Sequence, residues 1–234
     1  FKLPENVSTL EGALIEPLAV GFHAAIQGDA HLGQKAVVMG AGCIGLVSMM
    51  ALKARGVSEV YVVDIMEKRL EKALELVATV LSGMSNEEQM EDNIKTFRNF
   101  VPLNEEEKAV IAKAQELTGG AGMDLIIETA GTEITTRQAI HMAKKGSTIV
   151  LVGYSKSGEM TLPMSLVLDK ELTFKTVFRY RHIYPIAIDA VASGKVNVKG
   201  IVTNIYDLDD VQRAMDESVH NKADIVKGVI KIHP

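Results

Sequence analysis

The sequence KAVVMGAGCIG, residues 35–45, decides the fold of this chain. Its first part, Lys35–Gly40, is a short apolar run that ends in glycine, which is typical of a strand buried in a parallel sheet. Apolar residues then recur at helical spacing over Cys43–Arg55, and Gly56 closes the pattern as a helix C-cap does. The order strand, glycine-rich turn, helix predicts a βα unit.

The same alternation continues along the chain and predicts an α/β fold with a doubly wound, Rossmann-type parallel sheet. Further strands are predicted at Glu59–Asp64, Val77–Leu81, Met123–Glu128, Ser147–Val152 and Leu172–Phe178, and helices at Glu67–Leu76, Thr132–Lys145 and Tyr184–Ser193, before a strand–helix–strand tail that ends at Ile232. We expect residues 1–180 to form the cofactor-binding domain and residues 181–234 to form a tail that packs on it.

Composition narrows the class of protein. The chain has 234 residues, 47% of them hydrophobic, and a formal net charge of −5. An acidic balance gives no reason to expect nucleic acid as a partner, and no apolar run reaches the roughly 20 residues that span a bilayer. A single cysteine excludes a disulfide framework and favours a reducing, cytoplasmic location. A homo-oligomer is left open.

The turn after the first strand has the form G-x-G-x-x-G. Gly40 permits a tight turn, Gly42 lets the backbone approach a pyrophosphate, and Gly45 allows the helix to pack close to the strand. Asp64 ends the second strand 19 residues after Gly45, where its carboxylate can accept hydrogen bonds from both ribose hydroxyls. That carboxylate would repel a 2′-phosphate, so the pattern favours NAD over NADP. A methyltransferase loop is the main alternative, although it has less need of the third glycine.

Two side chains near this loop leave alternatives open. Arg69 either lays its guanidinium group against the adenine or is an exposed helix residue. Cys43, at the start of a helix, either has a lowered pKa and is reactive or packs beneath the loop, which we favour.

The interval between Asp64 and Met123 is too long for its predicted elements. It holds 58 residues, whereas a helix, a strand, a helix and their connections need about 40. Two capping-box patterns, at Ser85 and Asn104, predict two amphipathic helices, and their apolar stripes are Met90, Ile94, Phe97 and Val110, Ala114, Leu117. We expect Val77–Leu81 to pair beside the strand that ends at Asp64, with both helices outside that edge.

Beyond these patterns, the sequence resembles the cofactor domain of zinc-dependent medium-chain dehydrogenases of the sorbitol or xylitol dehydrogenase type. The matching motifs are VSTLEGALIEPLAVG (7–21), GAGCIG (40–45), Asp64 with Arg69, IETAG (127–131), LVG (151–153), VFRY (177–180) and GKV (194–196). The resemblance implies an NAD site at Gly40, Gly42, Cys43, Ile44, Gly45, Asp64, Arg69, Val152, Gly153, Tyr154, Val177, Phe178 and Arg179. It also implies that Glu16 lies beside a catalytic zinc and that Arg179 and Tyr180 face a polyol.

Two features depart from that family. Its zinc-bearing domain precedes the cofactor domain, whereas this sequence begins at Phe1, and its one cysteine and six histidines show no metal-ligand spacing. We therefore expect no metal site and little or no dehydrogenase activity from the chain alone. The second departure is Val77–Ala114, which resembles the last strand–helix unit of aldo-keto reductases; there the residues matching Ser82–Asn86, Gln89 and Asn93 lie near the adenosine of NADP.

Three interpretations are therefore open. The chain is an NAD-binding module cut from a polyol dehydrogenase, with a foreign-looking insert at residues 77–117. Alternatively, it is an oxidoreductase whose zinc domain comes from a second chain, with a polyol as substrate only then. The third interpretation is an engineered chimera that tests fold recombination, in which NAD binding is incidental.

Overall fold

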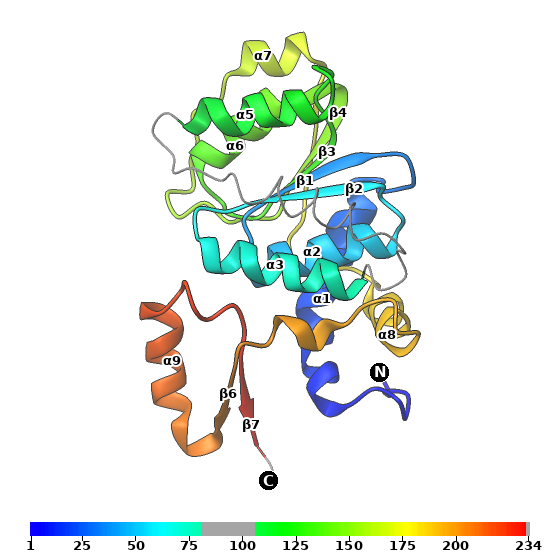
Figure 1. Ribbon diagram of the computed structural model, residues 1–234, viewed down its shortest axis with the longest axis vertical. Helices are drawn as coiled ribbons and strands as arrows, with labels where there is room; N and C mark the ends of the chain where they lie inside the picture. Colours follow the sequence, from blue (N-terminus) through cyan, green and yellow to red (C-terminus); the bar gives the residue numbers. More distant parts are fainter. Residues whose placement is uncertain (81–105, 233–234) are drawn as a thin grey trace.

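A computed structural model describes residues 1–80 and 106–232 of the chain (Figure 1). Its centre is a five-stranded sheet in the order β2-β1-β3-β4-β5, and all four pairings are parallel. The strands are β1 (Lys35–Met39), β2 (Glu59–Val63), β3 (Met123–Glu128), β4 (Ala143–Leu151) and β5 (Thr173–Thr176). The predicted α/β fold with a doubly wound parallel sheet is confirmed.

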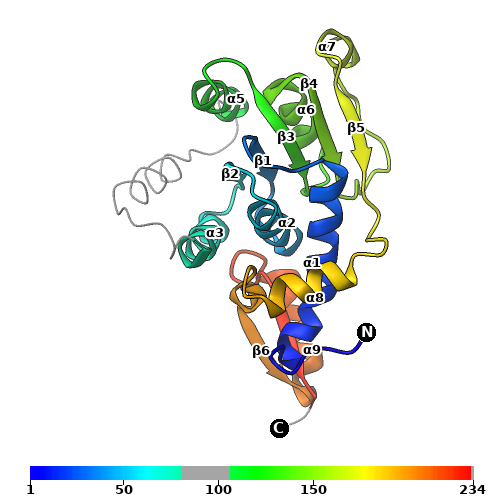
Figure 2. The ribbon, with the colours of Figure 1, turned by 90° about the vertical axis from the view of Figure 1, so that its right-hand side faces the viewer.

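Helices cover both faces of the sheet (Figure 2). One face carries α1 (Thr9–Gln27), α2 (Cys43–Ala54) and α3 (Glu67–Val80), and the other carries α5 (Glu106–Leu117), α6 (Glu133–Met142) and α7 (Met164–Asp169). Successive strand residues point to opposite faces, so Val38 packs toward α1 and α2 while Val37 and Met39 pack toward α5 and α6. Burial on both faces explains why the central strands β1 and β3 are largely apolar, whereas the edge strand β5 is mostly exposed and carries polar residues.

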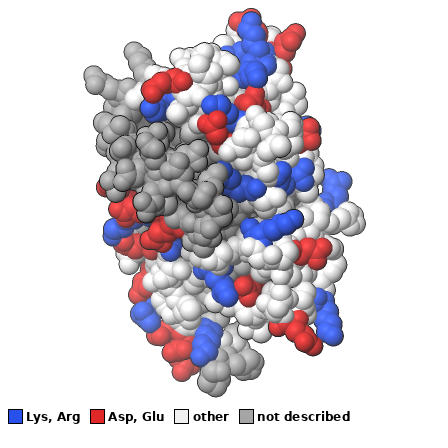
Figure 3. Space-filling model, turned by 45° about the vertical axis from the view of Figure 1, so that its right-hand side comes forward, with Lys and Arg blue, Asp and Glu red and all other residues white. Residues whose placement is uncertain are grey.

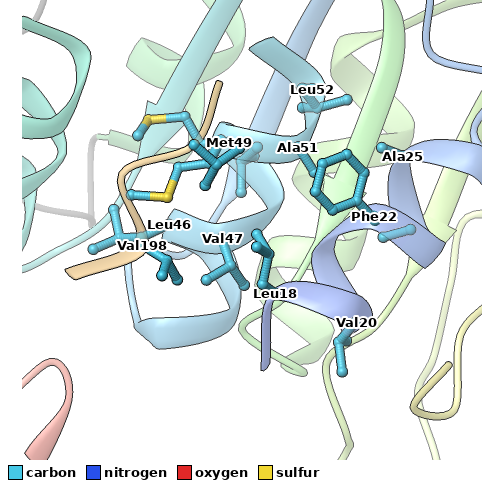
Figure 4. Close-up of a cluster of buried hydrophobic side chains, with 14 of the residues drawn as sticks. Leu18, Val20, Phe22, Ala25, Leu46, Val47, Met49, Ala51, Leu52 and Val198 are labelled. Carbon is cyan, nitrogen blue, oxygen red and sulfur yellow. The ribbon is translucent and has the colours of Figure 1, made fainter. Parts of the chain in front are cut away.

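The contact between α1 and α2 fixes the helix that follows the glycine-rich turn. Leu18 and Phe22 of α1 lie against Leu46 and Val47 of α2 in a buried cluster (Figure 4). At the crossing, a Cβ on Gly21 would stand 2.5 Å from the carbonyl oxygen of Val47. Only a glycine lets the two backbones come this close, so the contact with α1, on the same face of the sheet, fixes the position of α2.

The chain after residue 180 forms a smaller unit beneath the sheet, coloured yellow to red in Figure 1. It comprises α8 (Tyr184–Ala192), the 3-10 turns η1 (Val198–Ile201) and η2 (Leu208–Asp210), β6 (Asn204–Asp207), α9 (Val211–His220) and β7 (Gly228–Lys231). Strands β6 and β7 pair in parallel, and α8 packs on α1. The division of the chain at residue 180 stays a prediction.

The predicted strand at Val77–Leu81 is wrong over the residues that the structure describes. Helix α3 continues through this stretch to Val80, and Leu81 lies outside the described residues. The buried positions Leu70, Ala73 and Leu76 already follow a helical period, which no glycine or proline interrupts before Val80. The β-branched residues are too weak a signal to stop an established amphipathic helix. In the described part of the chain, β2 is therefore an edge strand.

Part of the predicted helical insert is confirmed. Helix α5 spans Glu106–Leu117, and Ala114 of its predicted apolar stripe is only 4% exposed. The helix packs on α6 over a face of the sheet, so its predicted place outside the β2 edge is wrong. The other predicted features lie outside the described residues. They are the caps at Ser85 and Asn104, the stripe Met90, Ile94, Phe97, and the residues Ser82–Asn86, Gln89 and Asn93.

Charged side chains of both signs occur on one face of the molecule. On the face shown in Figure 3, lysine and arginine side chains are interspersed with aspartate and glutamate side chains. Where the residues are described, opposite charges on that face partly cancel. Within the described residues, no helix has the length and the apolar composition needed to cross a membrane.

Candidate functional site

A cavity of about 560 Å³ opens where β2, β1 and β3 end. Strand β1 has β2 on one side and β3 on the other, so successive strands are added on opposite sides of β1, although all of them run parallel. Ligands of open α/β sheets bind in such a crevice, at the carboxyl ends of the strands. The cavity is lined by Gly40, Gly42, Cys43, Ile44, Gly45, Val63, Asp64, Ile65, Met66, Arg69, Thr129, Ala130, Thr132, Ile134, Thr135, Gln138 and Lys222.

The three glycines of the turn have the distinct geometries that their predicted roles require. Gly40 has φ +101°, which favours glycine, and a Cβ on Gly45 would lie 1.8 Å from the carbonyl oxygen of Gly40. Gly42 has an ordinary backbone conformation, with φ −72°, and a Cβ there would meet only Arg69 Nη1, at 3.9 Å. Gly40 and Gly45 therefore shape the loop, whereas Gly42 keeps the space above it open.

Beneath that open space, helix α2 begins with amides for which the helix itself provides no acceptor. Gly42 is the N-cap residue and has no side chain to bond to the first turn. The helical hydrogen bonds start with Leu46 N, which donates to Gly42 O at 2.9 Å. The amides of residues 43–45 precede that bond and lie at the positive end of the helix dipole, an arrangement that suits an anion.

Asp64 lies directly after β2 and is 8% exposed. Its Oδ2 accepts a hydrogen bond from Ala41 N at 2.6 Å, and its Oδ1 accepts one from Met66 N at 2.8 Å. Each carboxylate oxygen can accept more than one hydrogen bond, so both can still accept from a ligand hydroxyl. The carboxylate thus connects the glycine-rich turn to the start of α3.

The Arg69 guanidinium group belongs to this cavity and is held in place. Its Nη1 lies 3.8 Å from Asp64 Oδ2, while Nε and Nη2 donate to the carbonyl oxygen of Lys222 at 3.0 and 2.6 Å. Nearby, Lys68 forms an ion pair with Asp224. Arg69 is thus partly buried rather than fully exposed, and its predicted contact with an adenine stays a prediction. Its bonds to Lys222 connect the cavity to the chain after residue 180.

Cys43 lines the cavity but is not an activated thiol. Burial raises the pKa of the Cys43 thiol, the Glu16 carboxylate also raises it, and the Lys227 ammonium group lowers it. A reactive cysteine needs surroundings whose net effect lowers the pKa of its thiol. The packing role favoured from the sequence agrees with this environment.

The remaining predicted site residues form a second group at the ends of β4 and β5, away from the cavity lining. The amides of Val152 and Gly153 donate to Glu128 O at 2.8 and 3.0 Å, and Val177 N donates to Leu151 O at 2.9 Å. Tyr154 and Phe178 are exposed, as is Arg179, whose φ of +61° is unusual for a side chain of this size. Because the strands are parallel, this group lies along the same edge of the sheet as the cavity.

Tyr180 and Glu16 contribute to this second group. The Tyr180 ring lies edge-on to that of Tyr184, with centroids 5.1 Å apart and hydroxyl oxygens 3.3 Å apart. The hydrogen bond between the two hydroxyl groups, together with partial burial, raises the pKa of Tyr184 to about 12. The charge of Glu16, which is exposed on α1, adds to that shift.

Glu128, at the end of β3, is a buried carboxylate that the sequence analysis did not single out. It is 1% exposed and accepts hydrogen bonds from Ala130 N, Gly131 N and the Thr135 hydroxyl, at 3.0, 3.0 and 2.8 Å. Burial raises its pKa, against the lowering effect of these donors. Glu128 thereby positions the residues that form one wall of the cavity.

The described residues contain no group of three histidine, cysteine or acidic side chains placed to hold a metal ion. His23, the most buried histidine, already uses both ring nitrogens: Nδ1 lies 3.2 Å from Arg179 O and Nε2 lies 3.2 Å from Gln27 Nε2. Neither nitrogen is available as a ligand in this arrangement.

The sequence analysis missed several residues of the cavity lining. Ile65 and Met66 directly follow a strand end, so their place could have been predicted. Thr129 also follows a strand, and its hydroxyl donates to Met39 O at 2.8 Å. No sequence pattern near Lys222 indicates a place in the cavity, because Lys222 lies 153 residues after its partner Arg69 in the sequence.

A sequence profile described as zinc-binding dehydrogenase matches residues 43–193. The chain belongs to the zinc-binding dehydrogenase family. The zinc-type alcohol dehydrogenase-like protein YdjJ of Escherichia coli, described as uncharacterized, is 43% identical over 99% of this chain and 60% of its own length. Sorbitol dehydrogenase of Bos taurus is 39% identical over 100% of this chain and 60% of its own length.

A solved structure of a similar protein has the same fold as this chain. An Escherichia coli oxidoreductase/dehydrogenase of unknown specificity has a TM-score of 0.84 and 41% identity, over 100% of this chain and 61% of that one. The chain thus spans about 60% of the length of the relatives it matches. These matches confirm the resemblance to the cofactor-domain part of this family.

Proposed function

We propose that this chain is the NAD-binding part of a dehydrogenase that acts on polyols or related alcohols. The observation that carries the proposal is the conjunction, in one cavity, of a glycine-rich turn, the free amides at the start of α2 and the Asp64 carboxylate. A cavity of about 560 Å³ lies within the range of small-molecule sites. The substrate class rests on the sorbitol dehydrogenase relatives alone.

The cavity fits the adenosine and pyrophosphate parts of NAD by its chemistry. The amides of residues 43–45 would hold the pyrophosphate above Gly42, and Asp64 would accept hydrogen bonds from the ribose hydroxyls. Ile65 and Ile134, at 67% and 51% exposed, offer apolar surface on the cavity lining for a flat base. Gln138 is 2% exposed, and its Nε2 has no hydrogen-bond partner within the described residues, so an acceptor is missing there.

The second group of predicted residues would hold the rest of the cofactor. Val152, Gly153, Tyr154, Val177, Phe178 and Arg179 continue along the same edge from the cavity, at the ends of β4 and β5. When bound, NAD would supply the acceptor for a hydride. Glu16, Arg179 and Tyr180 stay candidates for substrate contact, but no zinc ligands accompany them within the described residues.

Isothermal titration of the chain with NAD and with NADP tests this proposal. We expect NAD to bind, and NADP to bind more weakly, because the Asp64 carboxylate would lose its ribose hydrogen bonds and repel the 2′-phosphate. Equal affinities for the two nucleotides would contradict the role of Asp64, and the absence of binding to both would contradict the function.

A further inference from the structure

One polar side chain on the cavity wall is buried although its donor has no acceptor. Gln138, on α6, is 2% exposed, and its Nε2 has no hydrogen-bond partner among the described residues. Gln138 lines the cavity together with Ile134 and Thr135. These residues lie four and three positions before it on the same helix, so all three share the face of α6 that is turned to the cavity.

Two hydroxyl groups of the same wall differ from Gln138, because they already bond to the protein. Thr129 Oγ1 donates to Met39 O at 2.8 Å. Thr135 Oγ1 donates to Glu128 Oε1, also at 2.8 Å. A buried N–H group without an acceptor is unfavourable, and native proteins contain few of them. The unpaired amide of Gln138, on the wall of a cavity, therefore indicates a ligand that supplies the missing acceptor.

The surroundings of Gln138 suit a flat, apolar ring with a polar edge. Ile134 lies one turn before Gln138 on α6, and Ile65 directly follows Asp64; both isoleucines line the cavity and are exposed. In small-molecule sites, apolar side chains cover most of the ligand and a few polar groups give specificity. The proposed function places a ribose at Asp64, so the base attached to that ribose lies at this end of the cavity.

The carboxamide of a glutamine is complementary to the edge of adenine. Its nitrogen can donate to a ring nitrogen while its oxygen accepts from the 6-amino group, and adenine has a ring nitrogen on each side of that amino group. We propose that Gln138 recognises the base of the dinucleotide by these two hydrogen bonds and thereby selects a purine that carries a 6-amino group. The inference rests on the proposed function, because it requires the ribose at Asp64.

Titration calorimetry with NAD and with the NAD analogue in which purine replaces adenine tests this inference, because the two ligands differ only in the 6-amino group. We expect the unsubstituted chain to bind NAD about tenfold more tightly than the analogue, since the analogue leaves Gln138 Oε1 without a donor. Gln138→Met keeps the length of the side chain and removes both ends of the amide. We expect this variant to bind NAD about tenfold more weakly than the unsubstituted chain does and to bind the two ligands equally.

Two further measurements separate recognition of the base from a structural role of Gln138. Gln115→Met is the matched control, because Gln115 is an exposed glutamine of α5 that does not line the cavity; it should keep the preference for NAD. Without nucleotide, Gln138→Met should melt at the same temperature as the unsubstituted chain or at a higher one, since it removes an unpaired buried amide. A markedly lower melting temperature would show that the amide is bonded in the free chain and would contradict the inference.

The titrations also distinguish failure of this inference from failure of the proposed function. Equal affinities of the unsubstituted chain for NAD and the purine analogue would overturn the role of Gln138 and leave the proposed function standing. A folded Gln138→Met variant that keeps the preference for NAD would do the same. If the unsubstituted chain binds neither ligand, the proposed function is overturned, and this inference with it. Gln138→Leu replaces Gln138→Met if the latter does not fold.

Discussion

The Asp64 carboxylate accepts a hydrogen bond from the backbone amide of Ala41, with 2.6 Å between Asp64 Oδ2 and Ala41 N. Ala41 is the buried residue between the first two glycines of the turn. One side chain therefore both supports the glycine-rich turn and lies where the proposed function places a ribose. Loss of this side chain has two separable consequences, one for stability and one for affinity.

Asp64→Ala should lower both the stability of the chain and its affinity for NAD. The buried amide of Ala41 would be left without its acceptor, which costs about 1–3 kcal/mol. Each lost hydrogen bond to a ribose hydroxyl should cost on the order of 1.5–3 kcal/mol of binding free energy. Urea unfolding and titration calorimetry measure the two effects. Asp64→Asn is the control, and an unchanged NAD affinity in Asp64→Ala would exclude Asp64 from the site.

Gly42→Val should abolish NAD binding and leave the fold intact. The backbone at Gly42 suits any residue, and a side chain there would point into the open space above the loop. Gly45→Ala is the contrasting variant, because its Cβ would overlap Gly40 O and should destabilise the chain itself. The measurements are titration heats and melting temperatures. Undiminished NAD binding by Gly42→Val would show that the loop is not the site.

Thr129→Val should weaken the support that the end of β3 gives to the glycine-rich turn. The Thr129 hydroxyl donates to Met39 O at 2.8 Å and lies 3.2 Å from Gly40 O. Valine keeps the shape but removes the donor, so we expect a loss of about 0.5–1.5 kcal/mol in stability and weaker NAD binding. Thr129→Ser retains the hydroxyl and should behave like the unsubstituted chain. Equal behaviour of the valine and serine variants would remove Thr129 from the loop's support.

The central strands β1 and β3 could be predicted from the sequence because they are buried on both faces and are largely apolar. The glycine-rich turn could be predicted because its three glycines are close in sequence. The boundary at Val77 could not, since a short run of β-branched residues is a weak propensity signal that the preceding helical pattern overrides. Lys222 could not be predicted either, because its contact with Arg69 depends on how a distant unit folds back.

The chain by itself should not oxidise sorbitol or xylitol, even with zinc added. Catalytic zinc needs three protein ligands that converge on one point. No such group occurs within the described residues, and residues 81–105 contain neither histidine nor cysteine. NADH absorbance in the presence of zinc is the measurement. Production of NADH that a chelator abolishes would favour the interpretation in which the chain is a working oxidoreductase.

The buried carboxyl group of Glu128 should make stability depend on pH. Burial, the largest influence, raises its pKa in the folded chain above the ordinary value of about 4.3, against the opposing hydrogen bonds from Thr135, Gly131 and Ala130. As the pH rises past the ordinary value, the unfolded chain ionises first. Stability should therefore fall between the ordinary pKa and the raised one and then level off, whereas below this range both states are protonated and the penalty disappears.

Glu128→Gln isolates this effect, because glutamine is neutral at every pH and keeps the oxygen that Ala130 N, Gly131 N and the Thr135 hydroxyl approach. We expect the free energy of unfolding of the unsubstituted chain, measured relative to that of the variant, to decrease from pH 4 to neutral pH. Urea titrations of both proteins across that range provide the test. A difference that instead increases with pH would mean that the three donors outweigh burial and lower the pKa of Glu128. The cavity wall would then be held by a charged group, and its loss at low pH would weaken NAD binding along with the fold.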